Sequence, residues 1–365
     1  MKLVTILGTR PEIVKLSPTL PIFDKIFEHI IIHTGQHYDY NMDKIFFEQL
    51  HLRDPDYNLD IGSGRQAEQT GKMMMKIESI LINVKPDAVL VFADPNTPLA
   101  GALVASKLHI PVIHFEAGCR SFNKKMPEEI NRILTDHCSD LLLAPDKVAY
   151  DNLIREGFDE KQIHVVGDIV FDATNRNKQF ITDSKILEKF GLTDNNYVLV
   201  TIHRAENTAN KESLGEIVDF VKYLSSKIDV VFPLHPRTRD TLKSFGLTID
   251  PKIKVIEPQG YIEFLKLISS SRFIVTDSGG VQEEAVVFNK CCLVARNETE
   301  WTRLTDIGKN ILATNKKENL IKWSDKLLND DELNRIKKIS FEFENDVSTK
   351  VVNIIKDFME NDIKK

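Results

Sequence analysis

Carboxylate side chains follow successive apolar runs in the N-terminal half of the chain. Asp94 and Glu116 each come after such a run, and Glu128 and Glu129 follow Pro127, where a helix is expected to begin. Carboxylates gathered in one cleft can raise the pKa of one member, so that the group serves as general acid and general base. A routine helix start is the alternative interpretation of Glu128 and Glu129.

A glycine-rich turn with acidic residues lies at 276–284, TDSGGVQEE. It follows an apolar run and precedes a helical pattern. Ser278, Gly279 and Gly280 would let backbone N–H groups approach a phosphate, whose charge a helix N-terminus favours. Glu284, one turn further on, is placed to accept hydrogen bonds from ribose hydroxyls. The alternative is a tight turn whose acidic residues complement the helix dipole.

Basic side chains follow other apolar runs. Segment 8–15, GTRPEIVK, has a proline suited to the first helical turn and places Arg10 and Lys15 beside a possible phosphate site. His203 and His235 each follow an apolar run and have an arginine within two residues. Two such pairs at successive strand ends indicate a ligand cleft. Solvated cations and histidines with structural partners are the alternatives.

The elements that must position these residues follow an alternating pattern. Near-continuous apolar runs separated by amphipathic stretches predict parallel sheets covered on both faces. The expected strands are 3–7, 29–33, 88–92, 112–115, 141–143 and 164–166, then 197–202, 230–234, 254–256, 273–276 and 292–295. Segment 182–196 is polar and interrupts the alternation, so it is the candidate linker. After residue 314 only helical patterns remain.

Length and composition limit the class of protein. The 365 residues suit two domains, and the pattern predicts an α/β fold of two Rossmann-like doubly wound halves with a ligand between them. A net charge of −6 argues against nucleic acid or anionic membrane as partner, and no run approaches the roughly 18 apolar residues of a membrane helix.

The four cysteines lack a Cys-x-x-Cys pair and predict reduced, buried thiols in a cytoplasmic protein. No zinc-site spacing or Walker loop occurs, so no metal or cofactor is expected.

Taken together, these segments resemble the non-hydrolysing UDP-N-acetylglucosamine 2-epimerase family. The matching pieces are GTRPEIVKLSP, TGQHYDYNMD, LAGALVASK, HFEAGCRS, MPEEINRILTDH, HRAEN, HPR, PQGYIEF and TDSGGVQEEA. The resemblance implies a GT-B-like fold with Rossmann-like domains at 1–175 and 176–345. It also implies a C-terminal helix at 346–365 that crosses back to the first domain, and we expect a homodimer.

The resemblance also implies individual roles and a reaction. Asp94, Glu116 and Glu128 would be the acid–base carboxylates, assisted at the diphosphate by His203. The residues implied to bind the UDP-sugar are Arg10, Lys15, His235, Ser278, Gly279 and Gly280 around the phosphates and sugar, Glu284 at the ribose, and Gln259 and Phe264 at the uracil. The reaction would eliminate UDP through a 2-acetamidoglucal and add it back with carbon 2 inverted.

The chain departs from the family pattern in places. Ala93-Asp94-Pro95 stands where the family has Gly-Asp-Thr, and Trp301 replaces an arginine expected near the diphosphate. A tryptophan at this position resembles the subgroup that acts on UDP-2,3-diacetamido-glucuronate. Arg303, two residues further on, would pair bidentately with the carboxylate of such a sugar, a geometry that arginine suits. The alternative is that Trp301 packs the domain and Arg303 faces solvent. Gln36, His37, Arg65 and Gln66 resemble part of a regulatory UDP-GlcNAc site of the family, although the spacing after His37 differs.

Three rival hypotheses remain. A GT-B glycosyltransferase would share the fold and the UDP site, but the N-terminal carboxylates favour an epimerase, which needs no acceptor. An inactive nucleotide-sugar binding protein is the second rival, motivated by Pro95 and Trp301. A hydrolysing epimerase is disfavoured by the Arg-Pro-Glu form of the N-terminal motif.

Overall fold

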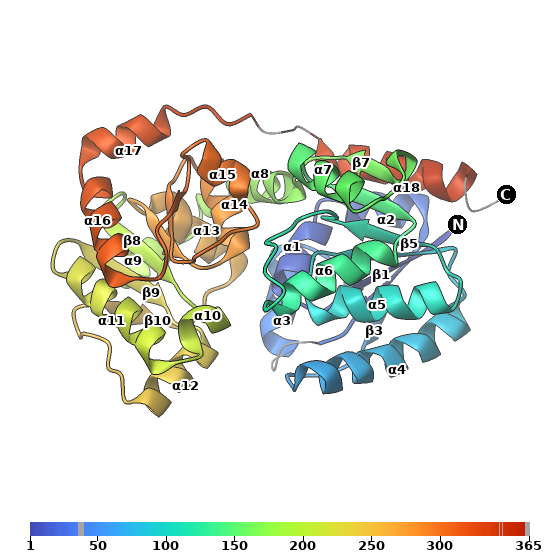
Figure 1. Cartoon of the computed structure of the whole chain (residues 1–365), viewed down its shortest axis with the longest axis horizontal. Helices are drawn as coiled ribbons and strands as arrows, with labels where there is room; N and C mark the ends of the chain where they lie inside the picture. The colour runs from blue at the N-terminus through green and yellow to red at the C-terminus, as the bar shows by residue number, and fades with distance from the viewer. Residues whose placement is uncertain (36–39, 343, 345, 362–365) are drawn as a thin grey trace. The chain divides into compact units, whose positions relative to one another are not determined.

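The computed structural model describes residues 1–35, 40–342, 344 and 346–361. Gln36 and His37 lie outside the described residues. The chain divides into two compact units, one formed by Met1–Arg176 with Phe343–Lys365 and the other by Asn177–Glu342. Each unit contains a parallel sheet with helices packed against it, as Figure 1 shows, which confirms the predicted α/β class. None of the described helices is long and apolar enough to cross a membrane.

In the sheet of the first unit, the strand order reverses direction between β1 (Lys2–Leu7) and β4 (Ala88–Phe92), the topological switch point of the sheet. Across the sheet, its described strands are β3 (Tyr57–Asn58), β2 (Glu28–His33), β1, β4, β5 (Val112–Phe115), β6 (Leu141–Ala144) and β7 (Ile163–Val165). The chain winds outward in one direction from β1 and in the other from β4. Ligands of such sheets bind at this reversal, beyond the carboxyl ends of the strands.

Helices cover the first sheet and fix its central strands. They are α1 (Arg10–Leu16), α2 (Leu20–Ile26), α3 (Tyr40–Gln49), α4 (Gln66–Val84), α5 (Asn96–Lys107), α6 (Pro127–His137), α7 (Lys147–Arg155), η1 (Glu160–Gln162), α8 (Ile169–Ile181, shared with the second unit) and α18 (Val347–Asn361). Figure 1 shows α4, α5 and α6 side by side. A Cβ atom on Gly101 of α5 would lie 3.0 Å from Ile6 and 3.2 Å from Val91, so glycine permits close packing on β1 and β4.

The sheet of the second unit repeats this plan. Its described strands, in order across the sheet, are β10 (Lys254–Ile256), β9 (Asp229–Pro233), β8 (Tyr197–Thr201), β11 (Ile274–Thr276), β12 (Cys292–Val294) and β13 (Ile311–Leu312). Here the reversal lies between β8 and β11. The hydroxyl groups of Thr201 and Thr276, 2.7 Å apart, join the last residues of these two strands.

Helices and one apolar core complete the second unit. The remaining helices are α9 (Ile186–Phe190), α10 (Ala205–Thr208), α11 (Lys211–Ser225), α12 (Pro236–Phe245), α13 (Tyr261–Ser270), α14 (Gly279–Val287), α15 (Thr302–Asp306), α16 (Lys317–Leu327) and α17 (Asp330–Lys337). Val200, Phe232 and Phe220 are buried where β8, β9 and α11 meet. Burial of strand residues on both faces explains their near-continuous apolar runs.

Some expectations about the organisation are wrong. The chain passes from one unit to the other within α8, between Arg176 and Asn177, beside the boundary at 175/176 that the family resemblance implies. Segment 182–196, the linker expected from composition, lies inside the second unit. That segment contains α9, so its polar composition reflects an exposed helix and its turns. The two-residue strands β3 and β13 are too short to produce a periodic pattern.

The chain returns to the first unit at its last helix. The backbone N–H and hydroxyl of Ser348 both donate to Asp172 at 2.8 Å, which caps the start of α18. The apolar face of α18 is buried, including Val351 and Ile355. All four cysteines are free thiols; Cys291 and Cys292 are buried, whereas Cys119 and Cys138 are only partly buried.

Candidate active site

Two neighbouring turns of the first unit carry the predicted carboxylates Asp94 and Glu116. They follow the paired strands β4 and β5, and the backbone N–H of Ala93 donates to the carbonyl of Phe115 at 3.0 Å. Ala93 has φ 59° and Glu116 has φ 74°, in the left-handed region that residues with a Cβ atom rarely adopt. Such conformations persist only where surrounding contacts hold them, and they concentrate at functional sites.

Glu116 forms an ion pair with Lys15 of α1 in largely buried surroundings. Burial raises the pKa of Glu116 above its ordinary value, and Asp94 and Asp168 add to the rise, although Lys15 acts in the opposite direction. A carboxyl group whose pKa is raised toward neutrality exchanges protons more readily at working pH. The surroundings of Glu116 therefore suit a general acid or base.

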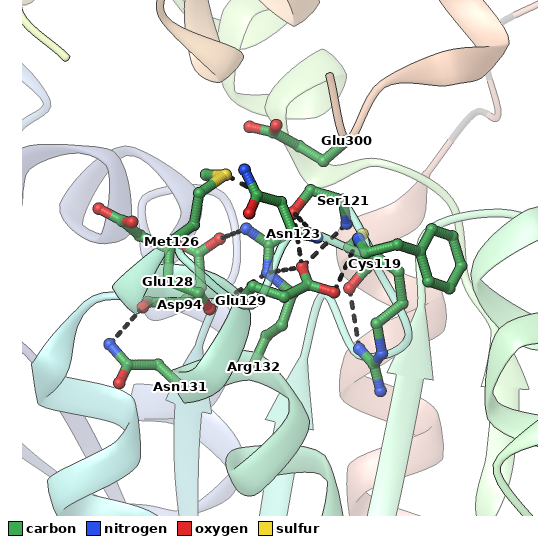
Figure 2. A network of polar contacts seen from close by, with 12 residues as sticks. Asp94, Cys119, Ser121, Asn123, Met126, Glu128, Glu129, Asn131, Arg132 and Glu300 are labelled. Atoms are coloured by element: carbon green, nitrogen blue, oxygen red, sulfur yellow. Dashed lines mark hydrogen bonds and ion pairs between the residues drawn. The ribbon is translucent and has the colours of Figure 1, made fainter. Parts of the chain in front are cut away.

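The start of α6 contributes two glutamates with different partners. The carboxylate of Glu129 accepts hydrogen bonds from the backbone N–H groups of Ser121 and Phe122, both at 2.9 Å, and is 1% exposed. The half-buried Glu128 has no side-chain partner among the described residues. Figure 2 shows Arg132 reaching Asp94, with an Nη2–Oδ2 distance of 2.7 Å. Glu129 therefore holds the loop, while Glu128 remains available to a ligand.

The turn after β1 brings Arg10 to the same edge of the first sheet. The guanidinium of Arg10 lies 5.4 Å from the centre of the Phe46 ring. Glu12 is fully buried and accepts hydrogen bonds from the backbone N–H of Gly8 at 2.9 Å and the hydroxyl of Thr9 at 2.7 Å. Burial raises the pKa of Glu12 to about 8. Glu12 thus shapes the turn that presents Arg10 and Lys15.

A buried aspartate organises the histidine turn of the second unit. Asp277 accepts hydrogen bonds from the backbone N–H groups of His203 and Arg204 and from the side-chain amide of Asn207, at 2.9 to 3.1 Å. Burial lowers the pKa of His203, and Arg204 and Arg237 add to this effect, whereas Asp277 opposes it. A histidine kept neutral in this way can take up a proton as charge develops nearby.

The glycine turn at 278–280 follows β11, which pairs with β8 at the point where the strand order of the second sheet reverses. A Cβ atom on Gly279 would lie 2.7 Å from Glu300 Oε1 and 3.0 Å from Trp301 Nε1, whereas one on Gly280 would meet no protein atom within 4 Å. Gly279 therefore admits the 300–301 loop, and Gly280 leaves backbone open to a ligand. Glu284 is buried within the same helix, α14.

The other predicted binding residues of the second unit lie on separate elements. The rings of His203 and His235 are 5.8 Å apart between centroids. Gln259 precedes α13, and Phe264 lies in its first turn, where the backbone N–H of Phe264 donates to the carbonyl of Gly260. Arg303 is half-buried in α15, with its guanidinium 5.1 Å from the centre of the Phe341 ring.

Sequence reasoning missed residues that hold the predicted ones in place. Arg132 is 2% exposed and bridges Asp94 to Glu129, and Arg296 is fully buried between Glu206 and Glu300. A buried arginine needs a carboxylate partner, but sequence cannot identify a partner that is distant along the chain. In the described part of the chain, no group of three or more His, Cys, Asp or Glu side chains has metal-binding geometry.

Comparison with known proteins identifies the family to which the chain is similar. A family model described as UDP-N-acetylglucosamine 2-epimerase matches residues 23–356. A UDP-N-acetylglucosamine 2-epimerase of Methanocaldococcus jannaschii is 50% identical over 339 residues, which cover 90% of this chain and 93% of the relative. A UDP-2,3-diacetamido-2,3-dideoxy-D-glucuronate 2-epimerase of Pseudomonas aeruginosa is 46% identical over 318 residues, which cover 86% of this chain and 88% of that protein.

Solved structures give the same result. The Methanocaldococcus jannaschii UDP-GlcNAc 2-epimerase in complex with UDP-GlcNAc and UDP has a TM-score of 0.92 at 47% identity, covering 98% of this chain and 99% of that one. The fold and the two sets of polar turns define an α/β enzyme of the GT-B-like type. The chain belongs to the UDP-N-acetylglucosamine 2-epimerase family.

Proposed function

We propose that this enzyme interconverts UDP-N-acetylglucosamine and UDP-N-acetylmannosamine by eliminating and re-adding UDP. The observation that carries the proposal is the placing of Asp94 and Glu116 on adjacent left-handed turns, one paired with Arg132 and the other with Lys15. Inversion at carbon 2 needs one group that removes a proton and another that returns a proton to the opposite face. Asp94, Glu116 and Glu128 supply such groups from three segments.

The proposed reaction balances without a redox step. A carboxylate takes the carbon-2 proton, the C–H electron pair forms the C1=C2 bond, and the C1–O bond breaks so that UDP leaves with its electrons. In the return direction a carboxylic acid protonates carbon 2 on the other face, and a phosphate oxygen of UDP bonds to carbon 1. The carbon-2 proton is weakly acidic, so the charge of the leaving UDP must be stabilised as it develops.

We assign the binding of UDP to the second unit. Ser278, Gly279 and Gly280 present backbone at the start of α14, where the helix dipole favours a diphosphate. His203 and His235 would bind beside it, Glu284 would accept from the ribose, and Gln259 and Phe264 would flank the uracil. Arg10 and Lys15 of the first unit would contact the phosphates and sugar. The Methanocaldococcus jannaschii relative was solved in complex with UDP-GlcNAc and UDP, which supports a UDP-sugar as the ligand of this fold.

A sugar modified at carbons 3 and 6 is the second candidate substrate. The Pseudomonas aeruginosa relative is named for UDP-2,3-diacetamido-2,3-dideoxy-D-glucuronate, and Trp301 replaces the expected arginine here. Trp301 is 3% exposed and lies against Gly279, which would place an apolar ring where the family has a cation. We propose Trp301 and Arg303 as the residues that decide between the two substrates.

Proton NMR in D2O tests the proposal directly. The enzyme is incubated separately with UDP-GlcNAc and with UDP-2,3-diacetamido-glucuronate, without any acceptor. We expect deuterium at carbon 2 of both epimers, because the carboxylic acid exchanges with solvent before re-addition. Product that retains its original carbon-2 proton would contradict elimination, and binding without turnover of either sugar would favour a binding protein.

We further propose that the enzyme acts in the cytoplasm as a homodimer and supports polysaccharide biosynthesis. Nucleotide sugars are activated donors for glycan synthesis, and the four cysteines are free thiols, as a reducing compartment requires. Sedimentation velocity over a concentration series tests the dimer, and a species with the mass of one chain throughout would contradict it.

A further inference from the structure

A buried histidine–aspartate pair lies beneath the turns that carry Asp94 and Glu116. His114 is in β5 and Asp136 is in α6, and both side chains are fully buried. The Nδ1 atom of His114 is 2.6 Å from Asp136 Oδ1, and its Nε2 atom is 2.9 Å from the carbonyl oxygen of Ala93. Ala93 directly precedes Asp94, so the histidine reaches the backbone of one carboxylate turn.

The aspartate reaches the other turn. Asp136 Oδ2 accepts a hydrogen bond from the backbone N–H of Gly118 at 3.1 Å and lies 2.6 Å from Nη2 of Arg120. Gly118 has φ 81° and stands two residues after Glu116. A single carboxylate in the core therefore connects the loop after β5 to the histidine that holds the loop after β4.

The hydrogen-bond chemistry of the pair is asymmetric. A backbone carbonyl can only accept, so His114 Nε2 donates to Ala93. Burial raises the pKa of Asp136, but His114 and Arg120 outweigh it and hold the pKa below its ordinary value. The Nδ1 atom faces the carboxylate of Asp136, so the ring is held by a hydrogen-bond partner at each of its nitrogen atoms.

The turns held in this way are conformationally strained. Ala93 and Glu116 are both in the left-handed region, which residues with a Cβ atom rarely adopt and in which they are strained. Without fixed partners, each turn would relax toward ordinary φ values and turn its carboxylate away. We propose that His114 and Asp136 are positioning residues that fix Asp94 and Glu116 relative to each other for proton transfer at carbon 2. This inference rests on the proposed function.

Two substitutions of His114 separate its two bonds. In His114→Gln the amide nitrogen takes the place of Nε2 and keeps the bond to Ala93, whereas in His114→Asn it takes the place of Nδ1 and keeps only the bond to Asp136. Displacing a reacting group by about 1 Å costs roughly 10²-fold in rate. We expect His114→Asn to lower kcat by about that factor with little change in KM or UDP affinity, and His114→Gln to retain much more turnover.

Three control measurements accompany this pair. His137→Gln changes a half-exposed histidine beside Asp136 and should leave kcat unchanged. Leu81→Ala removes a buried side chain of α4 and should lower thermal stability without lowering the kcat of folded protein. Calorimetry with UDP measures the affinity of the proposed binding site in the second unit, which should be unchanged in both His114 variants. Equal kcat in His114→Asn, His114→Gln and wild type, with only stability reduced, would overturn the inference.

The test also separates this inference from the proposed function. Wild-type enzyme that exchanges no carbon-2 proton with either UDP-sugar contradicts the proposed function, and the inference fails with it. Wild-type exchange that persists fully in His114→Asn overturns the inference alone. If neither variant folds, Asp136→Asn decides, because it keeps the shape of the side chain but replaces one acceptor oxygen by an amide nitrogen. A lower kcat with unchanged UDP affinity supports the pair, and an unchanged kcat overturns it.

Discussion

The carboxylates of the first unit share a chemical group but differ in surroundings, and this difference assigns their tasks. Glu12 and Glu129 are buried and accept backbone hydrogen bonds that shape turns. Glu116 is paired with Lys15, and Asp94 with Arg132. Glu128 has no side-chain partner in the described residues. Residue type and position after a strand predicted Asp94 and Glu116, but their partners depend on contacts that only the fold supplies.

Removing the acid–base groups should affect turnover far more than binding. Glu116→Gln and Asp94→Asn keep size and shape but cannot exchange protons, so each should lower kcat by about 10²–10⁴-fold. Glu284→Ala should instead weaken UDP binding with a smaller effect on kcat. Steady-state kinetics and calorimetry with UDP measure the two effects. Near-normal turnover in Glu116→Gln would show that the assignment of Glu116 is wrong.

Glu12 should make stability fall as pH rises. Its pKa in the folded protein is about 8, raised by burial from 4.5, so the folded state binds more protons than the unfolded state between these values. The stabilisation that Glu12 contributes to the folded state is fully present below about pH 4.5. It is lost as the pH rises toward 8, at about 1.4 kcal/mol of unfolding free energy per pH unit. Glu12→Gln, which stays neutral, should flatten this slope in urea unfolding at pH 5 to 9.

The exposed Glu68 provides the matched control for this measurement. Its pKa is lowered by Lys72 at the surface, so Glu68→Gln should keep the wild-type slope in this range. An unchanged slope in Glu12→Gln would mean that Glu12 is already ionised in the folded protein.

At the scale of elements, strands were predictable and the geometry of turns was not. Continuous apolar runs located the described strands other than β3 and β13 to within a residue or two, because burial on both faces imposes that composition. Composition alone pointed to segment 182–196 as the linker, since a helix that continues between units, as α8 does, has no break in its pattern. The left-handed conformation of Glu116 has no sequence signature, because glycine is the residue that normally indicates it.

The turn at Ala93 provides a test of stored strain. An alanine at φ 59° costs roughly 1–2 kcal/mol, and glycine avoids this but loses about 0.5–1 kcal/mol of unfolded-state entropy. Ala93→Gly should therefore stabilise the first unit by about 0.5–1 kcal/mol and raise its Tm by a few degrees. The control is Ala88→Gly at the start of β4, which should lower Tm. A lower Tm for Ala93→Gly would show that the turn is not strained.

At the scale of the whole molecule, the family is established and the sugar is the property left to test. If Trp301 and Arg303 select a modified sugar, UDP-2,3-diacetamido-glucuronate should exceed UDP-GlcNAc in kcat/KM. Arg303→Ala should then narrow the ratio by about ten- to a hundredfold, the worth of a charged hydrogen bond of roughly 1.5–3 kcal/mol. Arg335→Ala, at an exposed arginine, should leave the ratio unchanged. Equal loss on both substrates in Arg303→Ala would assign that arginine to packing on Phe341.

The return of α18 to the first unit has a consequence for how the protein is made on the ribosome. Residues 177–342 leave the ribosome as one uninterrupted segment, so the second unit can fold as soon as it emerges. The first unit begins earlier but lacks α18, and the surface that Val351 and Ile355 cover stays open until synthesis of that helix ends. All residues of the second unit are therefore synthesised before the last helix of the first unit. A chain that stops before residue 347 would expose apolar surface, and it would be a substrate for chaperones and proteases.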